Sequence, residues 1–353
     1  MPIEDVVDGL LETTVIPSFS RIGPLVRRPL FEWEPASADL TGAVAVVTGS
    51  SSGIGRAVAT ELVALGATVW VTSRSRDRAD AAAAEIAAAA ADLHAGSAGS
   101  GAADRAVGAG AVEPRAAGPG TTIAHAVDMG ELDQVRDFAT RVKSESGQVD
   151  LLIHNAGALT EERFTTSAGI EATVAAHLVG PYLLTRALVE ALAPDARILF
   201  MSSGGMYTQG LTLSGLEMSP DSYRGAVAYA RAKRAQVVLS ELLARELAGQ
   251  AVVHATHPGW AATDGVSAGL PVFDTVMGPL LRSPEEAADT MVWLATADEP
   301  ATTSGDFWHD RRRRSTHKLR ATHTDPARRA RLVEWLDTRI AEADAVAATS
   351  ADD

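Results

Sequence analysis

The sequence has 353 residues, a formal net charge of −14 and no cysteine. The lack of cysteine excludes disulfides, thiolate metal sites and cysteine nucleophiles, and the acidic balance argues against a general nucleic-acid binder. No apolar run reaches the roughly 18 residues of a membrane-spanning helix. No signal peptide is visible either, since Glu4, Asp5 and Asp8 occupy the place of a basic leader. We therefore expect a cytoplasmic protein.

The first 40 residues form an arm before the first predicted strand. A short helix is expected in which Val6, Val7, Leu10 and Leu11 share one face, followed by a segment rich in proline and arginine. Two interpretations stay open. We favour an arm packed on the core domain, and the alternative is a weak peripheral contact of residues 1–35 with a membrane or a partner.

An apolar run, a glycine turn and a helix follow one another after the arm. Residues 43–47 are apolar, Thr48–Gly55 reads Thr-Gly-Ser-Ser-Ser-Gly-Ile-Gly, and residues 56–66 repeat apolar positions at helical spacing. Glycines there let the backbone approach a pyrophosphate, which the positive end of a helix attracts. The residues expected at the phosphates are Gly49, Ser51, Ser52, Gly53, Ile54 and Gly55.

Strand and helix patterns alternate along the rest of the chain. Further strands are expected at residues 69–72, 122–127, 149–153, 196–201, 252–256 and 307–308. Helices are expected at 77–91, 131–144, 169–192, 226–247, from the N-cap Ser283 onward, and at 326–341. Residues 92–120 hold little besides Gly, Ala and Ser, so we expect a disordered insertion there.

This alternation predicts a Rossmann-like, doubly wound parallel sheet of about seven strands with helices on both faces. A single domain would cover residues 41–345, with a polar tail at 346–353. Ligands bind such sheets at the carboxyl ends of the strands. Six residues fall at these ends: Thr48, Arg74, Asp128, Asn155, Ser203 and Pro258.

Tyr229 and Lys233 are four residues apart on a predicted helix, which places them on one face. A phenol with its usual pKa of about 10 is a poor base at neutral pH. A neighbouring ammonium group and an oxidised nicotinamide would both favour the phenolate. Tyr229 could then exchange a proton with an alcohol or carbonyl oxygen.

These motifs, in this order, resemble the short-chain dehydrogenase/reductase family, and within it the member-12 type. The resemblance implies that Ser203 hydrogen-bonds the substrate oxygen, with Ser202 as its competitor for that role. It implies that Lys233 also holds the ribose and that the family pairs through its two long central helices. It assigns further cofactor contacts to Asp128, Met129, Asn155, Ala156, Gly157, Tyr229, Pro258, Gly259 and Thr263.

One position departs from the family pattern. His177 stands where the family usually has an asparagine, whose main-chain carbonyl holds a water near the lysine. The backbone role can survive this change, the imidazole can join the proton relay because its usual pKa is near neutrality, or the histidine can simply be packed in the helix.

Cofactor choice rests on the end of the second strand. Relatives that prefer NAD carry an acidic residue there, whereas this chain has Ser73 followed by Arg74, which can pair with a 2′-phosphate. We expect NADP, with NAD as the alternative. We expect no metal site at His254 and His257, and a solvated face or a subunit contact for residues 311–314. The resemblance places the family's substrate lid over 264–282, where the apolar side chains indicate either an apolar substrate or helix packing.

The sequence thus predicts an NADP(H)-dependent oxidoreductase that transfers hydride between the nicotinamide and a carbonyl or secondary alcohol of a lipophilic small molecule. Ser203, Tyr229, Lys233 and His177 are its candidate catalytic residues. The alternative is a non-catalytic nucleotide sensor or scaffold on the same fold. The expected partner is a small-molecule substrate and no nucleic acid is expected, while a homo-oligomer and a weak peripheral membrane contact through residues 1–35 stay open.

Overall fold

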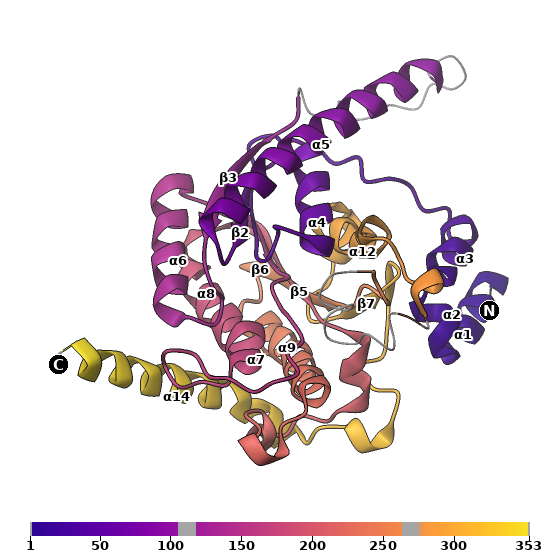
Figure 1. The fold of residues 1–353 in the computed structure, drawn as a ribbon. Helices are drawn as coiled ribbons and strands as arrows, with labels where there is room; N and C mark the ends of the chain where they lie inside the picture. Colours follow the sequence, from indigo (N-terminus) through magenta and orange to yellow (C-terminus); the bar gives the residue numbers. More distant parts are fainter. Residues whose placement is uncertain (1, 105–117, 263–274, 276, 352–353) are drawn as a thin grey trace.

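The computed structural model describes residues 2–104, 118–262, 275 and 277–351 (Figure 1). Its centre is an eight-stranded sheet with the order β3-β2-β1-β4-β5-β6-β7-β8. All neighbours are parallel except β7 and β8. The strands are β1 (Val44–Val47), β2 (Thr68–Ser73), β3 (Thr121–Ala126), β4 (Val149–His154), β5 (Leu192–Met201), β6 (Ala251–Thr256), β7 (Phe307–His309) and β8 (Arg312–Arg313).

This sheet confirms the predicted Rossmann-like fold. Seven strands lie within a few residues of where the apolar runs predict them. The eighth, β8, is too short to be recognised from sequence, and it exists because the chain turns back at Asp310 and Arg311, which both have positive φ.

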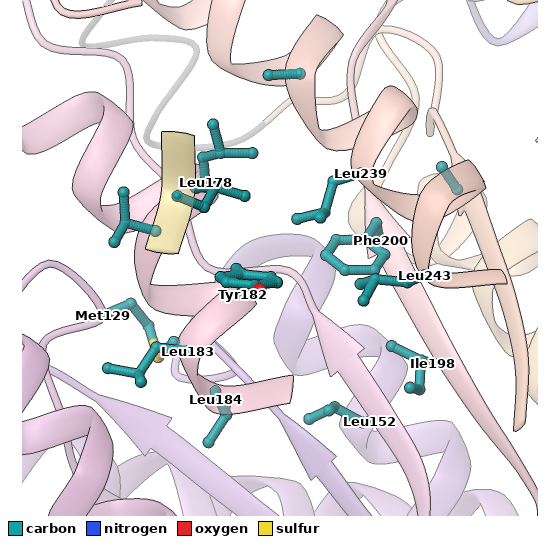
Figure 2. Packing of buried hydrophobic residues seen from close by; sticks show 14 of the residues in the cluster. Met129, Leu152, Leu178, Tyr182, Leu183, Leu184, Ile198, Phe200, Leu239 and Leu243 are labelled. Atoms are coloured by element: carbon teal, nitrogen blue, oxygen red, sulfur yellow. The ribbon is translucent and has the colours of Figure 1, made fainter. Parts of the chain in front are cut away.

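Helices cover both faces of the sheet. One face carries α4 (Gly53–Ala64), α5 (Arg76–Asp104) and α12 (Pro284–Thr296), and the other carries α6 (Leu132–Ser146), α8 (Gly180–Leu188) and α9 (Gly225–Glu246). Strand residues alternate between the two layers: Val46 packs with α6, α8 and α9, whereas Val47 packs with α4 and α12. Figure 2 shows the layer of α6, α8 and α9 around Tyr182, with Phe200 of β5 to its right and Leu152 of β4 below it.

The long helix expected at 169–192 is divided. Glu171 caps its start by accepting hydrogen bonds from the amides of Thr173 and Val174, so α7 covers Ala172–Val174. A π-helical turn, η1 (Ala175–Val179), then precedes α8 and widens the helix at His177. The remaining short elements are η2 (Val189–Ala191), η3 (Gly204–Thr208), η4 (Leu213–Gly215), η5 (Pro220–Ser222), η6 (Gly278–Leu280), α13 (Asp298–Ala301) and η7 (Arg320–Thr322).

Two helices are longer than predicted. The expected disorder from residue 92 is wrong as far as Asp104, because α5 continues to that residue. Alanine has the highest helix propensity and needs no burial to remain helical. The last helix, α14 (Pro326–Ala351), passes its predicted end at 341. Residues 105–117, Thr263 and most of the segment 264–282 lie outside the described residues.

The arm folds into three helices, α1 (Ile3–Thr13), α2 (Val15–Phe19) and α3 (Ile22–Leu30), which pack together at one side of the molecule (Figure 1). Phe19 is 3% exposed and belongs to the main hydrophobic core. On α1, Val6 and Leu10 of the expected apolar face are exposed, whereas Asp8 is buried.

Arginine pairs explain this orientation of α1. The side chain of Asp8 contacts Arg27 at 2.7 Å and Arg314 at 2.6 Å. Arg27 is completely buried and also contacts Asp310. The basic run 311–314 is therefore not simply a solvated face, because Arg314 is buried by pairs within the chain and Arg311 pairs with Asp289.

One helix in the described part of the chain, Ala172–Ala191, is long and apolar enough to cross a membrane, but 78% of that window is buried inside the protein. This helix lies between α6 and α9 and belongs to the hydrophobic core.

Candidate active site

A cleft of about 740 Å³ runs along the carboxyl ends of the parallel strands. The structure brings to it every predicted site residue that it describes. These residues are Gly49, Ser51, Ser52, Gly53, Ile54, Gly55, Arg74, Asp128, Met129, Asn155, Ala156, Gly157, His177, Ser203, Tyr229, Lys233, Pro258 and Gly259. Thr263 lies outside the described residues.

The glycine turn sits between β1 and α4 and packs on the end of β4. Gly49 has a φ of +64°, and a Cβ on it would lie 2.7 Å from the Cα of Ala156. A Cβ on Gly55 would lie 2.3 Å from Nδ2 of Asn155. A side chain at either position would therefore clash where the turn packs against the end of β4. This close packing leaves the amides at the start of α4 facing the cleft.

Asn155 fixes this turn directly. Its Nδ2 donates to the main-chain carbonyls of Thr48 at 3.0 Å and Gly49 at 3.1 Å, and the hydroxyl of Thr48 accepts from the amides of Asn155 and Ala156. At the end of β3, the carboxylate of Asp128 accepts from the amide of Gly130 at 2.8 Å. The cleft floor is thus a set of hydrogen-bonded strand ends.

Three side chains with acid–base capacity meet in the centre of the cleft. α9 carries Tyr229 and Lys233 on one face, with the ammonium nitrogen 5.6 Å from the centre of the phenol ring. The Nζ of Lys233 donates to the carbonyl of Met201 at the end of β5, at 2.7 Å. Ser203 follows β5, lines the cleft with this pair, and lies close enough to Tyr229 to lower the pKa of its phenol.

The two neighbouring serines have different surroundings. The hydroxyl of Ser202 is buried and donates to the main-chain carbonyl of Lys233 at 3.0 Å, so it connects β5 to α9. The hydroxyl of Ser203 accepts from the amide of Gly205 and faces Tyr229. The geometry therefore favours Ser203 over Ser202 as the group that contacts a reacting oxygen.

Burial controls the acid–base behaviour of the pair on α9. Burial raises the pKa of Tyr229, and the hydrogen bond from Ser203 opposes that rise. Burial lowers the pKa of Lys233 to about 7. Without a bound cofactor, the phenol is therefore protonated at neutral pH and can act as a proton donor.

His177 lies beside this pair, with its ring edge-on to that of Tyr229 and the two ring centres 5.3 Å apart. Its Nδ1 lies 2.8 Å from the carbonyl of Thr173 and must donate to it, which leaves Nε2 as an acceptor against Gly157. Nε2 has no partner among the described residues. Gln236 donates to the main-chain carbonyl of His177 at 2.6 Å.

Burial, and then the positive charge of Lys233, lower the pKa of the His177 imidazole to about 3. Of the three interpretations of this position, the lowered pKa argues against a relay through a charged imidazolium. Because it stays neutral at physiological pH, any contribution that it makes to proton transfer is that of a neutral hydrogen-bond acceptor.

The residues of the cleft fit a dinucleotide. The glycine turn and the start of α4 offer backbone amides to a pyrophosphate. At the end of β2, Arg74 is exposed and forms no ion pair within the described part of the chain. Arg78, one turn into α5, also lines the cleft. The sequence analysis missed Arg78, although its spacing of four from Arg74 could have indicated it.

The sequence analysis also missed the contribution of the arm to the site. The carbonyl of Phe19 accepts from the amide of Trp260 at 2.7 Å. Arg282 donates to the carbonyls of Ser18 and Pro258 at 2.8 and 3.1 Å. The arm therefore fixes the loop that follows β6. The arm residues Ser18 and Phe19 are more than 200 residues from their partners, so no local signal indicates these contacts.

Comparison with known proteins agrees with this site. Residues 83–311 match the family model described as enoyl-(acyl carrier protein) reductase, and residues 43–105 match the model described as short chain dehydrogenase. The chain is 35% identical over 304 residues to dehydrogenase/reductase SDR family member 12 of Homo sapiens, covering 84% of this chain and 86% of the relative. It is 30% identical to retinol dehydrogenase 13 of Homo sapiens, covering 78% of each.

Among solved structures, the fold is similar to that of an angucycline C-6 ketoreductase with bound NADP, with a TM-score of 0.56. The identity is 23%, and the match covers 79% of this chain and 97% of the ketoreductase. The Tyr229–Lys233 pair, the glycine turn and these matches lead to one conclusion: the chain belongs to the short-chain dehydrogenase/reductase family of NAD(P)-using enzymes and is an oxidoreductase.

Proposed function

We propose that this oxidoreductase uses NADPH to reduce the carbonyl group of a lipophilic small molecule to a secondary or primary alcohol, with Tyr229 as the proton donor. The observation that carries this proposal is the position of Tyr229 in the cleft, on the same face of α9 as Lys233 and together with Ser203. When bound, the nicotinamide supplies the hydride to the carbonyl carbon. Tyr229 gives its proton to the carbonyl oxygen, and Ser203 holds that oxygen.

Two features support the choice of NADPH and of a lipophilic substrate. Arg74 and Arg78 line the cleft at the end of β2, where a 2′-phosphate would add two negative charges. Leu159, Phe164 and Trp260 also line the cleft, and Phe164 is 53% exposed. The relative retinol dehydrogenase 13 is named for a lipophilic alcohol, and the similar ketoreductase structure contains NADP.

The proposal is tested by NADPH oxidation with a panel of lipophilic aldehydes and ketones. We expect turnover by the wild type and a loss of at least about a hundredfold in Tyr229→Phe, the lower range for a general acid. NADPH affinity, measured by fluorescence, should change little. If wild type and Tyr229→Phe bind NADPH equally but neither reduces any substrate, the sensor or scaffold alternative replaces the enzyme proposal.

Location and assembly remain predictions. A cytoplasmic location would be tested by cell fractionation. A weak peripheral membrane contact of residues 1–35 and a homo-oligomer are both retained as proposals. The exposed apolar side chains of the arm are the ones that would make the membrane contact.

A further inference from the structure

Helix α1 is oriented with its polar side toward the protein. Its carboxylates contact basic side chains that follow β7 in the chain. The three pairs are Asp5–Arg312, Asp8–Arg314 and Glu12–Lys318, each at 2.6 Å. Asp8 is 4% exposed and contacts the fully buried Arg27 as well. These contacts fix the rotation of α1 about its axis, because turning it over would leave Arg27 buried beside apolar side chains.

The opposite side of α1 is therefore apolar and exposed. Ile3, Val6 and Leu10 are 72%, 44% and 67% exposed, at a spacing that places them on one side of the helix. The neighbouring helices add three more exposed apolar side chains. We use the name arm's apolar face for the exposed apolar side chains of the three helices, which are Ile3, Val6, Leu10, Val15, Ile16 and Leu25. A soluble amphipathic helix normally has the reverse orientation.

Within α1, α2 and α3 the exposed charged side chains are Arg21 and Arg28, and Arg28 also lies 3.6 Å from Asp289. The carboxylates of α1 are buried or half-buried, three of them in ion pairs, and the exposed Glu32 and Glu34 come only after the end of α3. This stands out in a chain with a net charge of −14. Apolar side chains flanked by arginines, without an exposed carboxylate among them, complement the interface of an anionic lipid bilayer.

We propose that α1, α2 and α3 bind the surface of an anionic membrane, with the arm's apolar face below the headgroups and Arg21 and Arg28 at the phosphates. This inference deepens the proposed function. Membrane binding itself does not depend on that function, but the advantage for substrate supply rests on it. The same arm holds the Trp260 loop of the cleft through Phe19. A lipophilic carbonyl compound dissolved in the bilayer would then reach a cleft close to the membrane.

Vesicle co-sedimentation without substrate or cofactor tests the proposal. The probes are phosphatidylcholine vesicles with and without phosphatidylglycerol, at low and high salt. We expect the wild type to bind the anionic vesicles, less so in high salt. Leu10→Asp/Leu25→Asp should bind roughly tenfold or more weakly, because charged groups do not enter the apolar part of the interface. Leu319→Asp is the matched control, since Leu319 is 57% exposed outside the arm.

Circular dichroism and thermal unfolding establish that each variant is folded. A wild type that binds neither kind of vesicle overturns the proposal, as does equal binding by Leu10→Asp/Leu25→Asp. A dimer that this double variant dissociates, without vesicle binding, would assign the face to a second copy of the chain. Tyr229→Phe should bind vesicles like the wild type, so failure of the enzymatic proposal is seen separately.

Discussion

The main-chain carbonyl of Phe19 accepts a hydrogen bond from the amide of Trp260 at 2.7 Å, so the arm holds a residue that lines the cleft. The ring of Phe19 fills the space above Gly204, where an added Cβ would lie 2.7 Å from the ring. It also meets the ring of His257 edge-on, with the centres 4.4 Å apart. Phe19 thus contacts both loops that follow β5 and β6.

Replacing Phe19 by alanine should destabilise the protein and weaken cofactor binding. Loss of a fully buried phenylalanine ring costs about 3–5 kcal/mol of unfolding free energy. The loop after β6 would lose its packing support, so the Kd for NADPH should rise in the protein that remains folded. Urea unfolding and fluorescence titration measure the two effects. Leu25→Ala, at a position 72% exposed on the same arm, should change neither.

His177 should not titrate in the pH range of activity. With a pKa of about 3, the imidazole is neutral from pH 5 to 8, and the acid limb of the kcat/KM profile should be the same in wild type and His177→Asn. The same profile in Gln236→Met, which removes the hydrogen bond to the carbonyl of His177 without adding a titrating group, provides a control for general changes at this turn. A wild-type pKa between 6 and 7 that disappears in His177→Asn would contradict a neutral ring.

The burial of Lys233 should appear in the pH dependence of stability. Its pKa is lowered from 10.5 to about 7, so between these values the unfolded chain binds a proton that the folded chain does not. Between about pH 7 and about pH 10.5, the unfolding free energy of the protein therefore increases with pH. This gain in stability is lost as the pH falls back through the same range.

The measurement compares the cofactor-free wild type with Lys233→Met, which keeps the length of the side chain without its charge. The stability advantage of Lys233→Met should be largest near pH 7 and should shrink toward pH 10. A difference that stays constant across this range would show that Lys233 is not strongly perturbed in the folded protein.

Strand ends and glycine turns are features that the sequence predicts well, because each is a local pattern. Gly49, Asn155 and Ser203 each follow an apolar strand, and a parallel sheet necessarily brings such positions to one edge. The orientation of α1 could not be predicted in this way. Its apolar spacing is visible, but the side that faces inward is decided by Arg314, about 300 residues later in the chain.

Arg74 should determine the preference for NADPH over NADH. A charge-assisted hydrogen bond contributes about 1.5–3 kcal/mol, which corresponds to at least a tenfold rise in the KM for NADPH when the guanidinium is removed. Arg74→Ala should therefore weaken NADPH and leave NADH nearly unchanged. Arg78→Ala should have the same sign of effect, since Arg78 lines the same cleft. Equal losses for both cofactors would indicate a general folding defect instead.

α14 should prevent the chain from pairing through its central helices. Leu332 and Leu336 are completely buried and belong to the same core as α8 and α9. The hydroxyl of Tyr182 on α8 donates to Asp337 at 2.8 Å, so α14 covers the layer through which the family resemblance predicts pairing. Any homo-oligomer must therefore use another surface.

Light scattering tests this directly. Ending the chain before Pro326 would expose the apolar side chains under Leu332 and Leu336, and we expect this truncated chain to dimerise or aggregate. Asp337→Asn, which keeps a hydrogen-bond acceptor for Tyr182, should leave the mass of the full chain unchanged. A wild-type dimer whose cross-links join α8 or α9 of the two copies would show that α14 moves away in solution.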